Sequence, residues 1–339
     1  MTVYAKDQPG NFSNRIEHVA IIGAGGKLGQ HLTRALLATG KHTVTAITRP
    51  ESTSQLPEGV KVKYVDYGGE DSEVLVQALR GQQILIITMA VTAPRDTVSK
   101  LVRAASQAGV RYVMPNWFGH DPQNRKLCED SMLAQRDDQI RAEVETLGNI
   151  SYMQLVCNFW YEFSLGGGPN RFGFDFQKRS LVLFDDASVP INVTTWPRCG
   201  ESVAGLLSLK ELPEDEFDES PTLSQFRNAP VYVSSFLLTQ LDMFESVKRV
   251  TNTSNHDWDI TYESAEQRWK SSYGEVSHGN FGAFTKMLYS RMFFPNGGGD
   301  YESHRNLDNR LLNLPVENLD EATAAGILMG ENNEVPYSH

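Results

Sequence analysis

The chain has 339 residues, with 31 lysines and arginines against 42 aspartates and glutamates, and a formal net charge of -11. This acidic balance argues against a nucleic-acid partner, because proteins that bind the phosphate backbone carry a basic patch. The three cysteines have no C-x-x-C spacing and suggest neither a disulfide framework nor a metal site. No run of about eighteen apolar residues occurs, and the first fifteen residues are polar. We therefore expect a cytoplasmic protein without a membrane partner.

A short apolar run, a glycine-rich turn and an amphipathic helix follow one another in residues 19–40. Residues 19–22 show no polar alternation, as expected for a strand buried on both faces of a parallel sheet. A helical period begins at Gly29 and ends at Gly40. This order directs backbone N–H groups and a helix N-terminus at one place, which suits a pyrophosphate. The predicted dinucleotide contacts are Gly23, Gly25, Gly26, Lys27, Leu28 and Gly29.

The residues after the second predicted strand, 43–48, favour NADP(H) over NAD(H). At this position an acidic residue accepts a hydrogen bond from the ribose 2′-hydroxyl, whereas an arginine accommodates a 2′-phosphate. Arg49 supplies the guanidinium, and Ser52 and Thr53 supply hydroxyl donors. The alternative is that Arg49 is a solvated surface residue.

Strands and helices continue to alternate up to residue 157, which predicts an α/β fold with a doubly wound parallel sheet of the Rossmann type. Further strands are expected at 60–65, 84–90, 111–115 and 151–157, with helices at 72–81, 94–109 and 129–148. The ends of these strands add six residues to the predicted cofactor contacts, namely Asp66, Tyr67, Thr88, Met89, Ala90 and Asn116.

The alternation weakens after residue 157, and we expect a smaller α/β C-terminal lobe that binds substrate. The predicted domains are 1–160 and 161–339, with some later segments returning to the sheet. The acidic stretch 211–230 is typical of solvated surface, although its length is also compatible with a lid. Strands are expected at 181–184 and 231–238, and helices at 201–209, 240–250, 264–276, 279–291 and 319–329.

Two aromatic clusters follow the fifth and sixth strands, where a doubly wound sheet binds its ligand. We predict that both contact substrate; the alternative is that these side chains pack the second lobe against the sheet. The first cluster contains Trp117, Phe118 and His120, and the second contains Asn158, Phe159, Trp160 and Tyr161.

The catalytic residues are not assigned by any strong pattern, and the candidates are His120, Asp137 and Tyr161. The charges around Asp137 are more typical of a solvated helix face in which Asp137 pairs with Arg141. No tyrosine has a lysine four residues later, so the sequence does not support carbonyl reduction by a tyrosine whose pKa is lowered by a lysine.

The sequence resembles the NmrA-like and isoflavone reductase-like group of atypical short-chain dehydrogenases. The resemblance covers about residues 19–161 and implies an NADP(H) site. The matching features are the G-x-x-G-x-x-G turn of Gly23, Gly26 and Gly29, the pair Arg49 and Ser52, the segment RYVMPNWFG at 111–119, and the pair Asn158 and Phe159.

One departure from the group concerns the chemistry. Reductases of this group use a lysine on the long helix before the sixth strand, and counting back from Gly148 and Arg141 places that position at or near Asp137. No lysine occurs between Lys126 and Lys178. The resemblance therefore implies the cofactor more strongly than lysine-dependent reduction of a double bond.

Two functions remain open at this point. The first is an NADP(H)-dependent oxidoreductase that acts on a bulky aromatic small molecule in secondary metabolism, including a redox-neutral isomerisation that borrows and returns a hydride. The second is a non-catalytic NADP(H)-sensing regulator of the NmrA type that binds a protein partner. A dense aromatic pocket favours the enzyme, whereas the lack of a recognisable acid or base favours the sensor.

Overall fold

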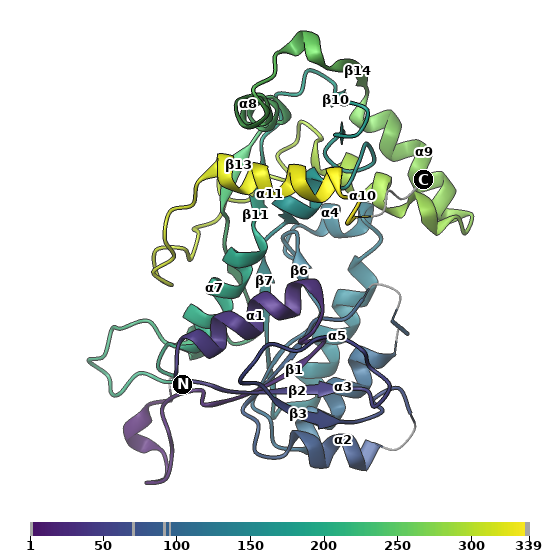
Figure 1. Ribbon diagram of the computed structural model, residues 1–339. Helices are drawn as coiled ribbons and strands as arrows, with labels where there is room; N and C mark the ends of the chain where they lie inside the picture. The colour runs from purple at the N-terminus through teal and green to yellow at the C-terminus, as the bar shows by residue number, and fades with distance from the viewer. Residues whose placement is uncertain (1–2, 70–71, 91–92, 95, 336–339) are drawn as a thin grey trace.

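The computed structural model describes residues 3–69, 72–90, 93–94 and 96–335. A parallel sheet with its helices forms the lower body in Figure 1, and a smaller lobe that contains α8, α9, α10 and α11 lies above it. The sheet contains β1 (His18–Ile22), β2 (Thr43–Thr48), β3 (Lys61–Tyr64), β4 (Ile84–Ile87), β5 (Tyr112–Met114), β6 (Phe118–Gly119), β7 (Ser151–Val156) and β12 (Ala229–Tyr232).

The strand order is β12-β7-β5-β4-β1-β2-β3, with β6 paired to β7, and all of these pairs are parallel. The apolar runs β1 and β4 occupy the middle of the sheet, because strands without polar alternation need both faces covered. The more polar β3 forms one edge. The predicted doubly wound Rossmann-type sheet is confirmed.

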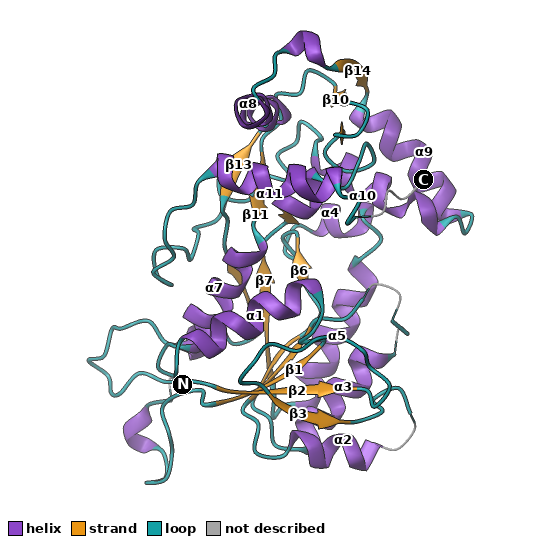
Figure 2. Cartoon of the chain, viewed as in Figure 1, coloured by secondary structure: helices purple, strands orange, loops and turns teal. Residues whose placement is uncertain are grey.

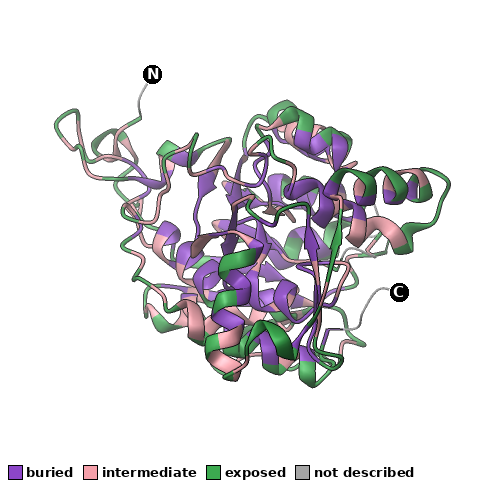
Figure 3. Cartoon of the chain, turned by 90° about the horizontal axis from the view of Figure 1, so that it is seen from above, coloured by how far each residue is buried: buried purple, intermediate pink, exposed green. Residues whose placement is uncertain are grey.

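Helices cover both faces of the sheet (Figure 2). Successive residues of β1 point to opposite faces: Val19 and Ile21 belong to a core shared with α1 and α7, whereas Ala20 and Ile22 belong to a core shared with α2, α3 and α5. Buried residues accordingly fill the middle of the molecule in Figure 3. These helices are α1 (Lys27–Ala38), α2 (Ser72–Leu79), α3 (Thr97–Gln107), α5 (Ala134–Leu147) and α7 (Trp196–Leu207).

The upper lobe has an aromatic core of its own, in which Phe172, Phe174 and Tyr289 are buried. Two three-stranded sheets lie in it, β14-β10-β9 and β13-β11-β8. Its elements are α4 (Arg125–Asp130), β8 (Phe159–Trp160), α6 (Tyr161–Leu165), β9 (Phe174–Asp175), β10 (Ser180–Phe184), β11 (Ile191–Thr194), β13 (Phe236–Leu238), α8 (Gln240–Thr251), β14 (Asp259–Glu263), α9 (Ala265–Ser277), α10 (Phe284–Met292) and α11 (Leu319–Glu331).

Three expected elements differ from the structure. The helix expected at 129–148 is two helices, α4 and α5, because Met132 adopts a left-handed conformation with φ of 59° between them. The strand expected at 231–238 is also divided, since β12 joins the main sheet and β13 joins β11 in the upper lobe. Helix α7 begins five residues earlier than predicted, because Thr195 caps it and Pro197 follows in its first turn.

Within the described ranges, no helix has both the length and the apolar character needed to cross a membrane. The lower body also receives chain from beyond residue 161, since β12 pairs with β7 and α7 packs beside α1 (Figure 1). The predicted domain boundary at residue 160 stays a prediction.

Candidate functional site

The turn between β1 and α1 leaves no room for side chains at two of its glycines. Gly23 has a φ of +82°, and a Cβ on it would lie 2.0 Å from the carbonyl oxygen of Thr88. A Cβ on Gly29 would lie 2.0 Å from the carbonyl oxygen of Gly23. The amide of Gly26 donates to the same oxygen at 2.9 Å, and α1 begins at the next residue without a side-chain cap. The first turn of the helix is therefore available to an anion.

The loop after β2 closes over this turn. A Cβ on Gly25 would lie 2.7 Å from the Cβ of Ser54. Arg49 stays half-exposed, with its Nε 3.4 Å from Glu51 Oε1, and its positive charge acts on the hydroxyl of Tyr67. Burial raises the pKa of that hydroxyl, so it remains protonated near neutral pH. The position of Arg49 at the carboxyl end of β2 is the one that the 2′-phosphate hypothesis requires.

The ends of β4 and β5 are joined by Asn116. Its side-chain amide donates to the carbonyl of Met89 at 3.0 Å and accepts from the Met89 amide at 3.2 Å. Thr88 Oγ1 donates to Ile22 O at 2.9 Å, so β1 is tied to the same group. The structure thus brings Thr88, Met89 and Asn116 together beside the glycine turn. Their contact with the cofactor stays a prediction, as does that of Asp66, whose carboxylate accepts from the Gly68 amide at 3.0 Å.

His120, a member of the first aromatic cluster, is buried. Its side chain is 4% exposed, its Nε2 is 3.3 Å from the hydroxyl of Ser131, and its ring meets the edge of Trp117. Burial, assisted by the positive charge of Arg291, lowers the pKa of His120 to about 4. The imidazole is therefore neutral near pH 7 and holds no second proton to give. Trp117 and Phe118 remain partly exposed.

Asp137 is buried rather than solvated. The predicted pair with Arg141 is confirmed, with Arg141 Nε 2.9 Å from Asp137 Oδ2. The expectation of a solvated face is wrong at Asp137, because Gln154 on β7 donates to its carboxylate and only 5% of the residue is exposed. Burial raises the pKa of this carboxyl. Both of its oxygens are nevertheless engaged by neighbouring side chains.

Three residues of the second aromatic cluster are buried in packing contacts, and the fourth, Trp160, is only half-buried. Asn158 is 2% exposed and donates to Asn192 O at 2.7 Å, and the ring of Phe159 stacks on Tyr289 at 3.7 Å. Tyr161 is fully buried, and its hydroxyl bonds to Thr323 Oγ1 at 2.8 Å. These contacts are those of the packing alternative, and a contact of these three residues with a substrate stays a prediction. Trp160 remains half-buried.

Trp196 lies against the first turns of α1, a position that the sequence did not reveal. It lies at the start of α7, where Lys27 Nζ stands 5.7 Å from its ring centroid and the ring of His31 stacks on it at 5.9 Å. Trp160 and Phe163 approach it at 6.1 and 5.6 Å. We call Trp160, Phe163 and Trp196 the indole cluster. The cap residue Thr195 before Trp-Pro was the signal that could have placed Trp196 in the first turn of a helix.

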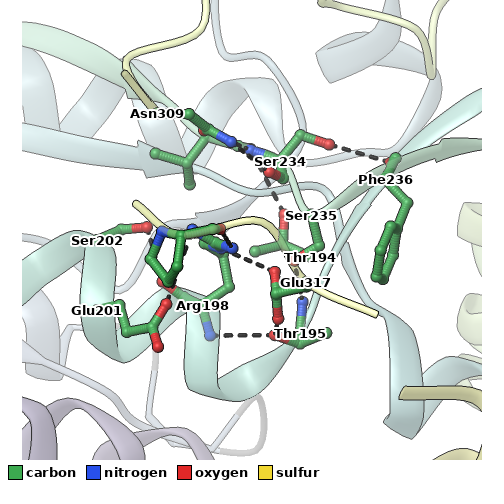
Figure 4. Close-up of polar contacts among 12 residues, drawn as sticks. Thr194, Thr195, Arg198, Glu201, Ser202, Ser234, Ser235, Phe236, Asn309 and Glu317 are labelled. Atoms are coloured by element: carbon green, nitrogen blue, oxygen red, sulfur yellow. Dashed lines mark hydrogen bonds and ion pairs between the residues drawn. The ribbon is translucent and has the colours of Figure 1, made fainter. Parts of the chain in front are cut away.

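Arg198 fixes the start of α7 in place (Figure 4). Its guanidinium is buried, its Nε lies 2.8 Å from Glu317 Oε2, and it also donates to the carbonyl of Pro315. Glu317 in turn accepts from the Thr195 hydroxyl at 2.5 Å. This network attaches the segment before α11 to the cap of α7 and so determines where Trp196 stands.

An open cavity of about 540 Å³ is unrelated to this region. Its lining includes His18, Thr43 and Lys61, which begin β1, β2 and β3. It therefore lies at the amino-terminal edge of the sheet, whereas ligands of such sheets bind beyond the carboxyl ends of the strands. We assign it no part in the site.

Comparison with known proteins agrees with this geometry. Residues 23–146 match a family model described as NAD(P)H-binding. The sequence is 27% identical over 317 residues to oxidoreductase aprR of Aspergillus flavus, covering 92% of this chain and 99% of that protein. The fold is similar to isoflavone reductase, with a TM-score of 0.69, 19% identity and coverage of 91% and 98% of the two chains. It is also similar to AtPrR2 with NADP+ and (+)pinoresinol, with a TM-score of 0.62, 21% identity and 96% coverage of both chains.

The family match agrees with a nicotinamide dinucleotide cofactor, because the matched domain is described as NAD(P)H-binding. The matched residues include the glycine turn, Arg49 and Asn116. The resemblance deduced from the sequence agrees with these findings: residues 23–146 match an NAD(P)H-binding domain, the chain is similar to an oxidoreductase over most of its length, and its fold is similar to that of isoflavone reductase.

Proposed function

We propose that this protein is an NADP(H)-dependent oxidoreductase that acts on a bulky aromatic small molecule in secondary metabolism. The observation that carries the proposal is the position of the indole cluster. Trp196 lies against Lys27 and His31 in the first turns of α1, next to the glycine turn that suits a pyrophosphate. A planar aromatic substrate held there would lie beside the cofactor, and stacked rings are well suited to hold it.

The chain's own residues would hold the cofactor at three points. The turn from Gly23 to Gly29 and the N-terminus of α1 would bind the pyrophosphate. Arg49 would bind the 2′-phosphate, and Asn116 would position the end of β4 through its two bonds to Met89. The bound cofactor supplies or accepts a hydride.

The candidate acids favour a reaction that needs no proton from the protein. His120 is neutral because of its lowered pKa, Asp137 is held by Arg141 and Gln154, and the hydroxyl of Tyr161 is buried against Thr323. Because counting places the position of the group's lysine at or near Asp137, a redox-neutral isomerisation, in which the hydride leaves the substrate and returns to it, is the second form of this proposal.

Incubation with cofactor and a panel of aromatic compounds tests the proposal. Purified protein is mixed with NADPH or NADP+ and with phenylpropanoid-like and alkaloid-like compounds, while nicotinamide absorbance, chromatographic retention of the product and product mass are followed together. Net reduction changes the absorbance and the mass, whereas isomerisation gives a new product without net cofactor consumption. Tight cofactor binding with no conversion of any compound would contradict the proposal and favour an NADP(H) sensor.

A matched pair of glycine variants supplies the control. Gly29→Ala places a Cβ against the Gly23 carbonyl and should remove activity together with cofactor binding. Gly10→Ala meets nothing within 4 Å and should keep both. Activity that survives in Gly29→Ala would mean that conversion does not depend on the predicted turn.

A further inference from the structure

The indole cluster is bordered by a buried cation. Arg171 is 7% exposed, and its guanidinium carbon lies 4.3 Å from the ring centroid of Phe163. The guanidinium fills the space beside Gly167, where a Cβ would lie 1.8 Å from Nη1, and Nη1 donates to the Gly167 carbonyl at 3.1 Å. Only a residue without a side chain at 167 permits this placement.

Arg171 has no carboxylate partner within the part of the chain that the structure describes. Other buried arginines do: Arg198 pairs with Glu317, and Arg291 pairs with Asp130 at 2.7 Å. A buried guanidinium without a counter-charge carries an unrelieved desolvation cost. Its Nε is also buried, with no hydrogen-bond acceptor in the described ranges.

Two further donors in the same cluster lack acceptors among the residues that the structure describes. The indole Nε1 atoms of Trp160 and Trp196 are both buried and unpartnered, and their rings are 6.1 Å apart. Buried donors are nearly always satisfied in folded proteins, so three of them around one group of rings require an explanation. Oxygen atoms of a bound ligand would supply such acceptors.

We propose that Arg171 and the indole cluster form a subsite for the carboxylate of an aromatic small molecule. The guanidinium matches a carboxylate in charge and geometry, the indole N–H groups supply further donors, and the faces of the rings suit an aromatic body. Trp160 and Phe163 are only half-buried and form the open side of the subsite. This inference deepens the proposed function and rests on it, because it specifies the class of substrate.

A pair of probes that differ only in charge tests the subsite. The probes are 4-hydroxycinnamate and its primary amide, titrated calorimetrically into the NADP+-loaded protein at pH 7.5. We expect the carboxylate to bind about tenfold to a hundredfold more tightly than the amide, as for a hydrogen bond to a charged group. Equal affinity for the two probes would overturn the inference.

Three variants test which side chains cause the preference for the carboxylate over the amide. Arg171→Met keeps an apolar stem over Phe163 and should remove the preference for the carboxylate, whereas the control Arg80→Met, at an exposed arginine beyond α2, should preserve it. Trp160→Phe and Trp196→Phe keep the rings but delete the N–H donors, and each should weaken carboxylate binding several-fold. If Arg171→Met does not fold, Trp160→Phe and Trp196→Phe alone test whether the subsite binds the carboxylate. Unchanged carboxylate affinity in both would overturn the inference.

Titration of NADPH alone into the wild-type protein separates the two proposals. Failure to bind NADPH contradicts the proposed function. Normal NADPH binding without a preference for the carboxylate contradicts only the subsite.

Discussion

Glu162 is a carboxyl group buried where α6 meets the start of α7. It is 5% exposed, and its two oxygens each lie 3.3 Å from the Trp196 amide, which donates to them. Burial raises the pKa of Glu162 from 4.5 to about 7, and the negative charge of Glu317 acts in the same direction. Glu162 accepts from the backbone amide of Trp196, the residue at the centre of the indole cluster. A change in the charge of Glu162 therefore affects both the stability of the fold and the surroundings of Trp196.

Proton linkage determines whether the free energy of unfolding rises or falls with pH. Between pH 4.5 and about 7 the folded state retains a proton that the unfolded state has lost, so the free energy of unfolding falls as the pH rises through this window. The contribution is fully present below pH 4.5 and is lost above about pH 7. At about 1.4 kcal/mol for each pKa unit, the whole effect is about 3 kcal/mol.

Replacement by glutamine removes the titration and keeps the shape. We predict that the difference in unfolding free energy between Glu162→Gln and the wild type changes by about 3 kcal/mol from pH 4.5 to pH 7.5, in favour of the variant at the higher pH. Urea unfolding at a series of pH values measures it. The exposed Glu245, which pairs with Lys248 at 2.7 Å, is the matched control for the same substitution. Parallel stability curves for Glu162→Gln and the wild type would refute the reasoning.

Three other predictions concern the cofactor turn and the frame around it. Arg49→Ala should weaken NADPH binding by about 1.5 to 3 kcal/mol, because a charge-assisted bond is lost, and should leave NADH binding unchanged. Fluorescence titrations measure both affinities. An equal loss of affinity for NADPH and NADH would show that Arg49 does not select the cofactor. Gly29→Ala should lower the melting temperature and abolish NADPH binding, because its Cβ meets a carbonyl oxygen at 2.0 Å, whereas Gly10→Ala should change neither. Arg198→Met should cost about 3 to 5 kcal/mol in urea unfolding, because it leaves Glu317 without its buried partner. Adding Glu317→Gln should recover part of that loss, and full additivity of the two changes would contradict the pairing.

The sheet was predictable from the sequence because its signals are local. The apolar runs of β1 and β4 required a central position, and the glycines of the first turn are needed where a backbone carbonyl occupies the space of a Cβ. The position of Arg49 could be predicted because Arg49 directly follows β2 in the chain, and its contact with a 2′-phosphate stays a prediction. In each case neighbouring residues in the chain carry the information.

The upper part of the site depends on contacts between distant segments, and the sequence predicted less of it. The charges around Asp137 suggested a solvated helix face, but Gln154, 17 residues later on β7, buries the carboxylate. The sequence predicted that Tyr161 contacts a ligand, whereas in the structure its hydroxyl bonds to Thr323 of α11. Trp196 reaches the cofactor turn because Arg198 and Glu317 hold the start of α7, a contact between residues more than a hundred positions apart.

Calorimetric titration of the wild-type protein with NADPH and with NADH tests the central claim most directly. The glycine turn and Arg49 predict saturable binding of NADPH at one site per chain, at least about tenfold tighter than NADH, as expected for a guanidinium that binds the 2′-phosphate. Binding of neither cofactor, or equal affinity for both, would contradict the account of this chain as an NADP(H)-dependent oxidoreductase.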